Sequence, residues 1–321
     1  MAAEDLGIAA VASDPAALIA SDVDVVHVCT PNSTHAAFAG SALAAGKHVI
    51  CEKPLAISVG DAEVLAATAR TSGLIAAVPF VYRYHPMVRE ARARIAKGEL
   101  GALLTLDCSY LQDWLLDSGG GDWRATPALG GSSRAFADIG SHLCDLIEFV
   151  TGERIVRLGA RTRTVHTERA GSAVTTEDIA AVLFELSGGA LGTMLVSQTA
   201  PGRKNALVLE VHGTAESVRF VQERPDELWV GRRTGSYVLL RDPETASPDA
   251  ARLSLVPAGH PMGYQDAFNA FIADAYAAVR GEQVDGLPTF EDGLRAVRLT
   301  QAVLDSAATK QWIEVTEAAP R

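Results

Sequence analysis

The sequence predicts an α/β unit followed by an α+β unit: an N-terminally incomplete, Rossmann-like unit over residues 1–98, then a unit built on a large open antiparallel sheet over residues 99–321. In the first unit, β-branched apolar runs alternate with Ala-rich stretches, the pattern of a parallel sheet with crossover helices. After Gly98 this changes to period-two strands joined by turns. With 321 residues, 48% of them hydrophobic, the chain is long enough for two domains.

The first unit is defined by three apolar runs and three segments of helical composition. Each of these helical segments is followed by a glycine, Gly46, Gly73 or Gly98, the residue that most easily adopts the left-handed conformation after a helix. We expect strands buried on both faces over residues 23–29 and 48–51, a third strand over 74–80, and helices over 36–45, 59–71 and 87–97.

The second unit shows mostly alternating polar and apolar residues, as expected of strands with one buried face. Its strands are expected over residues 103–111, 155–165, 179–186, 192–198, 206–212, 217–222, 227–231 and 311–315. Its helices are expected over residues 134–150, 264–280 and 291–308.

Composition excludes several classes of protein. There are 28 Lys plus Arg against 39 Asp plus Glu, a net charge of −11, and no basic cluster interleaves with aromatics, which disfavours nucleic-acid binding. No apolar run is long enough for a membrane span and no secretion signal is present at Met1. The four cysteines lack metal-ligand spacing, so we expect buried reduced thiols and a cytoplasmic protein without a metal site.

A first polar motif, Thr30-Pro31-Asn32-Ser33-Thr34-His35, begins where the first strand ends. In open α/β sheets, ligands bind outside the carboxyl ends of the strands. Thr30, Pro31, Asn32 and His35 are therefore expected at the edge where a cofactor would lie. The alternative is an ordinary strand-to-helix turn in which Asn32 or Ser33 caps the helix.

A second motif, Glu52-Lys53-Pro54, follows the next strand. Because parallel strands end at the same side of a sheet, we expect Lys53 near the first motif. A residue before proline is held in extended backbone, which favours a fixed direction for the Lys53 ammonium. A solvated loop lysine is the alternative.

A third motif lies on the predicted helix 134–150. Asp138 and His142 are four residues apart and Asp145 follows three later, so a regular helix places all three on one face. This face is interpreted either as solvated, with an internal Asp-His hydrogen bond, or as a metal site, or as an acid/base pair. The metal site is disfavoured because no fourth ligand is evident. We favour the acid/base pair.

Three stretches together resemble the glucose-fructose oxidoreductase and inositol dehydrogenase family, Gfo/Idh/MocA: CTPNSTHAAFAGSALAAGKHVICEKPLA (29–56), GDWRATPALGGSS (121–133) and DIGSHLCDLIEFVTG (138–152). The resemblance implies an NAD- or NADP-dependent dehydrogenase acting on a sugar or polyol. It implies that Lys53, Asp138 and His142 are catalytic. It also implies that the cofactor is bound by Thr30, Pro31, Asn32, His35, Glu52, Pro54, Trp123 and Arg124.

These residue types suit that chemistry. When a secondary alcohol is oxidised, a hydride leaves its carbon while a base takes the hydroxyl proton. A cation beside the oxygen stabilises the developing alkoxide. His142 suits the first role and Lys53 the second, and Asp138 can orient the imidazole. If Lys53 is desolvated, its pKa falls and it can share the proton transfer.

The sequence departs from the family pattern at its start, because it contains no G-x-G-x-x-G. The chain is interpreted as beginning near the end of a helix over residues 2–6, roughly two strands into the expected fold. The explanations are a late start or shortened chain, a truncation rescued by a partner chain, or a degenerate protein with a non-catalytic binding or oligomeric role. The strand over residues 23–29 would then have an unpaired edge.

Three further segments are candidates for the substrate cleft. Arg83-Tyr84-His85 follows the third strand, Gln112-Asp113-Trp114 follows the first strand of the second unit, and His260 to Tyr264 precede a helix. Aromatic rings stack on sugars and amides bind hydroxyls, but interdomain packing is an equal interpretation. Open sheets of this kind pair face to face, so a homo-oligomer is expected.

Overall fold

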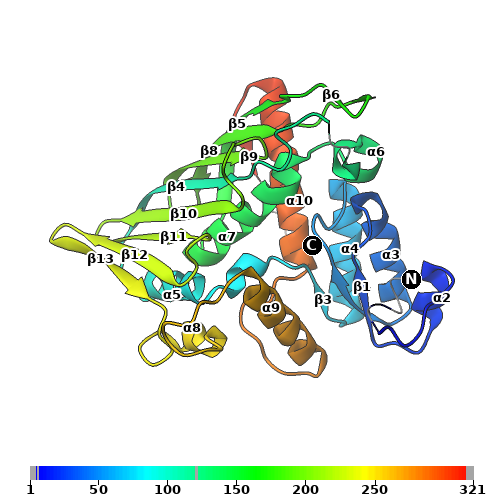
Figure 1. Ribbon diagram of the computed structural model, residues 1–321, viewed down its shortest axis with the longest axis horizontal. Coiled ribbons are helices and arrows are strands. Elements are labelled where there is room, and N and C mark those ends of the chain that lie inside the picture. Colours follow the sequence, from blue (N-terminus) through cyan, green and yellow to red (C-terminus); the bar gives the residue numbers. More distant parts are fainter. Residues whose placement is uncertain (1–4, 6, 120–121, 316–321) are drawn as a thin grey trace.

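The computed structural model describes residues 5, 7–119 and 122–315 (Figure 1). The first unit contains a parallel sheet of β1 (Val25–Val28), β2 (His48–Cys51) and β3 (Ala76–Ala77), in the order β1-β2-β3. Its helices are α2 (Pro15–Ala20), α3 (Asn32–Ala44) and α4 (Val59–Ser72). The helix expected over residues 2–6 lies, apart from Asp5, outside the described residues.

Strand β1 is an edge strand in the described part of the chain, with β2 as its neighbour. Val26 and Val28 are buried, whereas His27 is exposed and its Nε2 lies 3.0 Å from the Tyr276 hydroxyl. The prediction that this strand is buried on both faces is therefore wrong for β1. On the face that carries His27, helix α9 covers Ile50 of β2 and Ala77 of β3, whereas His27 lies at the open edge of the sheet and stacks on Tyr276.

The second unit is a nine-stranded sheet in the order β13-β12-β11-β10-β4-β9-β8-β5-β14. Its strands are β4 (Leu103–Leu111), β5 (Ile155–Arg163), β8 (Ile179–Leu186), β9 (Leu191–Ser197), β10 (Ala206–Gly213), β11 (Ser217–Val221), β12 (Glu227–Arg232), β13 (Gly235–Leu240) and β14 (Ile313–Glu314). A small separate hairpin joins β6 (Glu168–Arg169) to β7 (Ser172–Ala173).

The sheet is mixed, which corrects the expectation of a fully antiparallel one. Strands β4 and β9 pair in parallel, and the other pairs are antiparallel. Between β4 and β9 the chain runs through helices up to α7 and then through β5 and β8. A long connection of this kind, in place of a tight turn, is what allows two strands to be parallel. Strand β13 was also not predicted, because most of its side chains are exposed and give no buried face to recognise.

Helices cover one face of this sheet (Figure 1). They are α5 (Pro86–Ala96), α7 (Ser141–Thr151) and α10 (Phe290–Thr309), and the main core lies between them and the strands. Shorter helices are η1 (Val81–Tyr84), η2 (Trp123–Ala125), α6 (Pro127–Gly130) and α8 (Pro248–Leu253), and α9 (Tyr264–Val279) packs on η1.

Helix α10 joins the two units. Phe290, Leu294 and Val297 belong to the hydrophobic core of the first unit, whereas Leu299 and Val303, further along the same helix, belong to the core of the large sheet. The start of α10 thus covers the parallel sheet and its end covers β5. This shared helix fixes the two halves of the site relative to each other.

The remaining sequence expectations concern thiols, charge and membranes. All four cysteines are free. Cys51, Cys108 and Cys144 are buried, but Cys29 is exposed at the end of β1, so the expectation of buried thiols is wrong at Cys29.

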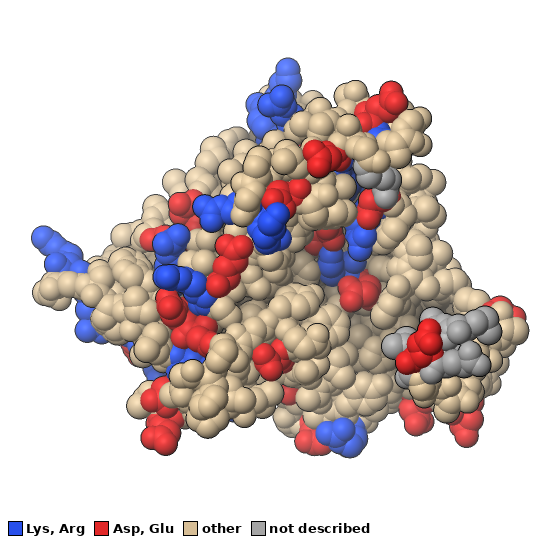
Figure 2. Space-filling view, viewed as in Figure 1, with Lys and Arg blue, Asp and Glu red and all other residues tan. Residues whose placement is uncertain are grey.

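Lys and Arg intermix with Asp and Glu on the face shown in Figure 2. Among the described residues, no helix has the length and apolar character needed to cross a bilayer.

Candidate active site

The site is built around a contact between the two units. Lys53 follows β2, and Asp138 lies in a π-helical turn that precedes α7. The Lys53 Nζ donates to Asp138 Oδ1 at 2.6 Å and to the Asp138 backbone oxygen at 2.8 Å. Both side chains are mostly buried, with exposed fractions of 15% and 18%. Lys53 and Asp138, which were candidates from two separate motifs, are therefore in direct contact.

The carboxylate of Asp138 is surrounded by donors. Gln198 Nε2 donates to Oδ2 at 2.7 Å, and Arg124 Nε lies 3.9 Å from Oδ1. Burial by itself would raise the pKa of Asp138, but the charge and hydrogen bond of Lys53, followed by the charge of Arg124, outweigh it and lower that pKa. Asp138 is thus an anion that holds the Lys53 ammonium.

His142 lies in the first turn of α7 and is buried. Its ring packs edge-on against Phe80 and Tyr82, with centroids 5.6 Å and 5.1 Å away. Burial, with the charge of Lys53, lowers the pKa of His142 to about 3, although Asp138 opposes this. The imidazole is therefore neutral, and its buried Nδ1 has no hydrogen-bond partner among the described residues.

Asp138 lies in the π-helical turn over Phe136–Gly140, whereas His142 and Asp145 lie in α7, so the three residues do not belong to one regular helix. The start of this turn is anchored by Glu177, whose Oε1 accepts from the Ser133 hydroxyl at 2.7 Å and from the backbone amides of Arg134 and Phe136. Asp138 faces Lys53, but Asp145 is bound by Arg83, whose Nε donates to Asp145 Oδ2 at 2.8 Å. Asp145 therefore does not join Asp138 and His142 in one stripe.

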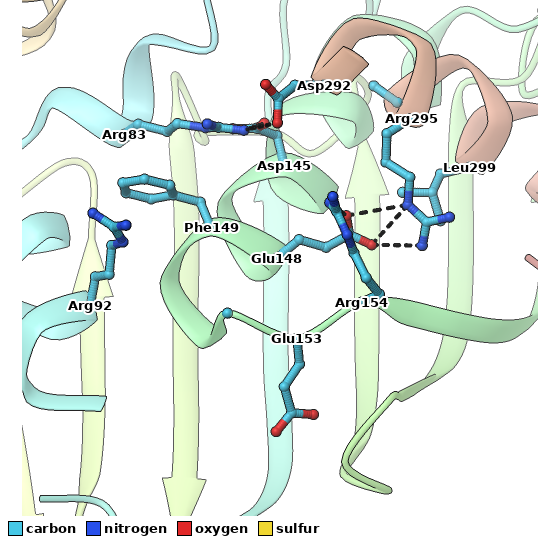
Figure 3. Close-up of a pocket in the computed structure, with 12 residues that line it drawn as sticks. Arg83, Arg92, Asp145, Glu148, Phe149, Glu153, Arg154, Asp292, Arg295 and Leu299 are labelled. Atoms are coloured by element: carbon cyan, nitrogen blue, oxygen red, sulfur yellow. Dashed lines mark hydrogen bonds and ion pairs between the residues drawn. The ribbon is translucent and has the colours of Figure 1, made fainter. Parts of the chain in front are cut away.

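Asp145 belongs instead to a network of ion pairs around a separate pocket of about 290 Å³ (Figure 3). Arg83 also pairs with Asp292 of α10, and Glu148 pairs with Arg295 and Arg154. This pocket is lined by α7 and α10 and contains none of Lys53, Asp138 and His142. In the described part of the chain no His, Cys, Asp and Glu cluster fit to hold a metal ion is found.

The predicted cofactor-binding residues of the first unit lie at the carboxyl ends of β1 and β2. Thr30 and Thr34 hydroxyls are 2.6 Å apart, and Asn32 Nδ2 donates to the Gly130 backbone oxygen at 3.0 Å. Pro31 precedes α3 and makes no side-chain cap. Asn32 therefore ties this edge to the second unit.

His35 is placed differently from a ligand-facing residue. It is buried, and its ring nitrogens lie 2.7 Å from the Pro54 backbone oxygen and 2.8 Å from that of Thr30. It connects the loops that follow β1 and β2. Glu52 and Pro54 lie in the second of these loops, and the Lys53-Pro54 peptide bond is cis.

Trp123 and Arg124 form η2. The Arg124 guanidinium lies over the Trp123 ring at 4.4 Å, and the Arg124 amide donates to Asp122 Oδ1 at 2.8 Å. Because Arg124 also reaches toward Asp138, this short segment lies beside the catalytic candidates. In the sequence analysis, this position of Trp123 and Arg124 was implied by the family resemblance alone.

Sequence reasoning missed several residues around His142. Tyr82 touches the His142 ring, and its hydroxyl bonds to that of Tyr110, which donates to Asn205 Oδ1 at 2.6 Å. Gln112 Nε2 donates to the same oxygen at 3.0 Å. Of these residues only Gln112 was among the cleft candidates; Tyr82, Tyr110 and Asn205 carry no motif. The pairing of β4 with β10 brings Tyr110, Gln112 and Asn205 together.

The three candidate segments for the cleft have different outcomes. Gln112 joins the network just described, and the Tyr264 ring lies 6.1 Å from that of Tyr82. Burial, with Tyr82, Glu52 and Asp138 nearby, raises the pKa of Tyr264 to about 12. Tyr84 and His85, by contrast, are buried among core residues.

Two family models match the chain. Residues 1–80 match an oxidoreductase family with an NAD-binding Rossmann fold, and residues 88–219 match the GFO/IDH/MocA C-terminal domain. The chain is 31% identical over 322 residues to a levoglucosan dehydrogenase of Pseudarthrobacter phenanthrenivorans, covering 92% of this chain and 81% of that protein.

Solved structures agree with this similarity. An oxidoreductase domain protein from Kribbella flavida superposes with a TM-score of 0.91 at 36% identity, covering 98% of this chain and 87% of that one. A levoglucosan dehydrogenase in complex with NADH and levoglucosan gives a TM-score of 0.91 at 30% identity, covering 98% and 86%.

Proposed function

This chain belongs to the GFO/IDH/MocA family of NAD-binding oxidoreductases, and on that premise we propose that it transfers a hydride between a nicotinamide cofactor and a secondary alcohol of a sugar or polyol. One observation carries the proposal. A buried lysine at the carboxyl end of β2 is held by the carboxylate of Asp138, and a neutral histidine lies within electrostatic reach of both.

The residues at the edge of the parallel sheet fit the nicotinamide half of NAD. Helix α3 begins after Pro31 without a side-chain cap. The Thr34 amide bonds to the Pro31 oxygen, which leaves the first two amides of the helix to meet a ligand. The Thr30 hydroxyl and the Asn32 amide supply polar groups at the same edge. Thr30, Pro31, Asn32, Glu52, Pro54, Trp123 and Arg124 would hold the cofactor, with His35 fixing the two loops between them.

Each group in this site has a separate role in the proposed hydride transfer. A bound nicotinamide supplies the hydride acceptor. The Lys53 ammonium donates a hydrogen bond to the substrate oxygen and stabilises negative charge as it develops there. Neutral His142 accepts the hydroxyl proton, and Asp138 stabilises the imidazolium that results, since its charge favours the protonated ring.

The substrate class is proposed from the relatives and from the wall of the site. The similar proteins are named for levoglucosan and for scyllo-inositol, both polyhydroxylated rings. In this chain two part-buried amides, Gln112 and Asn205, and the exposed Tyr264 lie near Tyr82. Such groups bind sugar hydroxyls.

The test measures cofactor binding first and turnover second. Tryptophan fluorescence is titrated with NADH and with NADPH, and absorbance at the nicotinamide band is then followed with a panel of sugars and polyols. We expect saturable binding of one cofactor and turnover with at least one cyclic polyol. No binding of either cofactor would contradict the proposal and favour a non-catalytic binding role.

We further propose that the protein is a homo-oligomer formed through the open face of the large sheet, and that it acts in the cytoplasm. Leu183, Leu191 and Leu195 of β8 and β9 are exposed on this face, together with Leu104 of β4. An apolar patch of this kind is typical of an interaction surface. The free thiols of all four cysteines suit a reducing compartment.

A further inference from the structure

We propose that Gln198 is a positioning residue of the site, whose amide fixes the Asp138 carboxylate so that Oδ1 faces Lys53. This rests on the proposed function. Gln198 follows β9 directly and is fully buried. Its Nε2 donates to Oδ2 at 2.7 Å, while Lys53 donates to Oδ1 at 2.6 Å. Each carboxylate oxygen therefore has its own donor, one from each unit.

The backbone of Gln198 is held on both sides. Its amide donates to the Asp178 oxygen at 3.1 Å, and its carbonyl oxygen accepts from the Leu115 amide at 3.2 Å. Asp178 is itself fully buried between Arg134 and Arg169. The donor that reaches Asp138 thus projects from a rigid part of the sheet, as a preorganised site requires.

The oxygen of the Gln198 side-chain amide also supports this role. Its Oε1 is buried and has no hydrogen-bond partner among the described residues, which is unfavourable for an acceptor. Rotating the amide by a half-turn would place Oε1 against Asp138 Oδ2, so that two acceptors would face each other. The orientation is therefore set by the need for a donor at Asp138.

Without this donor, the Asp138 carboxylate is free to rotate. Arg124, 3.9 Å from Oδ1, would then compete with Lys53 for it. The groups that affect the charge of Asp138 are Lys53 after β2, Arg124 in η2 and His142 in α7. The tyrosines whose titration Asp138 influences are Tyr82, Tyr110 and Tyr264.

The test compares Gln198→Met, which keeps the volume and removes the donor, with Gln198→Glu, which keeps a donor only while the introduced carboxyl is protonated. For Gln198→Met we expect kcat to fall by about 30-fold or more, while KM for the substrate changes by less than about threefold, because misaligned catalytic groups lower turnover more than binding. A kcat within about threefold of wild type would overturn the proposal.

In Gln198→Glu, two carboxylates in contact share one proton. Lys53 keeps Asp138 the anion, so the shared proton lies on the introduced carboxyl and provides the hydrogen bond to Asp138. When this proton is lost the donor is lost with it, so we expect the basic limb of the kcat profile to move to lower pH by about one unit or more, which a merely structural defect would not do. Gln222→Glu is the matched control, since Gln222 is also a buried glutamine directly after a strand of this sheet, β11. The proposal fails if the limb does not move in Gln198→Glu, or moves equally in the control.

A second readout does not need turnover. Infrared spectra at pH 7 are expected to show a protonated carboxyl band in Gln198→Glu that is absent from wild type and is lost when Asp138→Asn is added. Absence of this band in a folded Gln198→Glu protein overturns the positioning role. If the band appears but wild type turns over no sugar or polyol, the proposed function fails and the contact between residues 138 and 198 stands.

Discussion

At the scale of single residues, Lys53 depends on groups outside its own loop. Its ammonium is held by both the side chain and the backbone oxygen of Asp138, which a surface lysine would lack. We predict that Lys53→Met lowers kcat by about 10³-fold, because the charge beside the reacting oxygen is lost. Steady-state turnover measures this. Lys47→Met is the control, since Lys47 is half-buried and its Nζ donates to the Ser21 backbone oxygen at 3.1 Å; equal activity of the two variants would count against the assigned role.

A second residue-scale prediction concerns His85, which is buried against Tyr82 and Phe220. Burial lowers its pKa from 6.5 to about 4. Above pH 6.5 both the folded and the unfolded states hold a neutral ring, so the stabilisation is complete. Below it, the unfolded state binds the proton first, and stability is lost as pH falls from 6.5 toward 4. The full loss is about 3 kcal/mol.

Urea unfolding at pH 7 and pH 4.5 tests this effect. We expect His85→Leu to lose less free energy of unfolding between these pH values than wild type does, by about 2 kcal/mol. His260→Leu, at an exposed histidine, is the control and should follow the wild-type dependence. The explanation is wrong if His85→Leu and wild type lose the same amount.

At the scale of elements, Arg83 connects η1, α7 and α10 through Asp145 and Asp292 (Figure 3). Tyr82 precedes Arg83 in the chain and packs on His142. His142 in turn lies three residues before Asp145 in α7. We predict that Asp145→Asn lowers the free energy of unfolding by about 3–5 kcal/mol, because a buried guanidinium loses its main partner. Arg70→Ala breaks the exposed Arg70–Glu291 pair between α4 and α10, and should cost at most about 1 kcal/mol. Chemical denaturation compares them; similar losses would show that burial does not set the cost.

At the scale of the whole molecule, the open face of the large sheet carries the oligomer proposal. We predict that Leu183→Glu combined with Leu195→Glu yields a monomer, because two charges would enter an apolar contact. Light scattering after gel filtration measures the mass. Val64→Glu, on an equally exposed apolar residue of α4, should keep the wild-type mass. A wild-type protein that is already monomeric would contradict the proposal.

The sequence by itself determined the local features of this protein. The glycines after the helices do take positive φ, 76° at Gly46, 68° at Gly73 and 75° at Gly98, because their positions follow from helix-end chemistry. The parallel β1–β2 pair, which brings the loops that carry Thr30 and Lys53 to one edge, also agrees with the sequence analysis. Strand ends in a parallel sheet share one edge, so these contacts depend on rules that a single motif can express.

Only the tertiary structure decided which distant groups complete the site. Asp138 lies in the π-helical turn at Phe136–Gly140 and Asp145 in α7, and helical periodicity gave no sign of this turn. The contact of Gln198 with Asp138 and the parallel pairing of β4 with β9 depend on strand order within the sheet. Strand periodicity shows which face of a strand is buried but not which strand lies beside it. The sequence therefore names Lys53 and Asp138 as candidates, whereas packing between segments far apart in the chain decides that they touch and how the carboxylate is oriented.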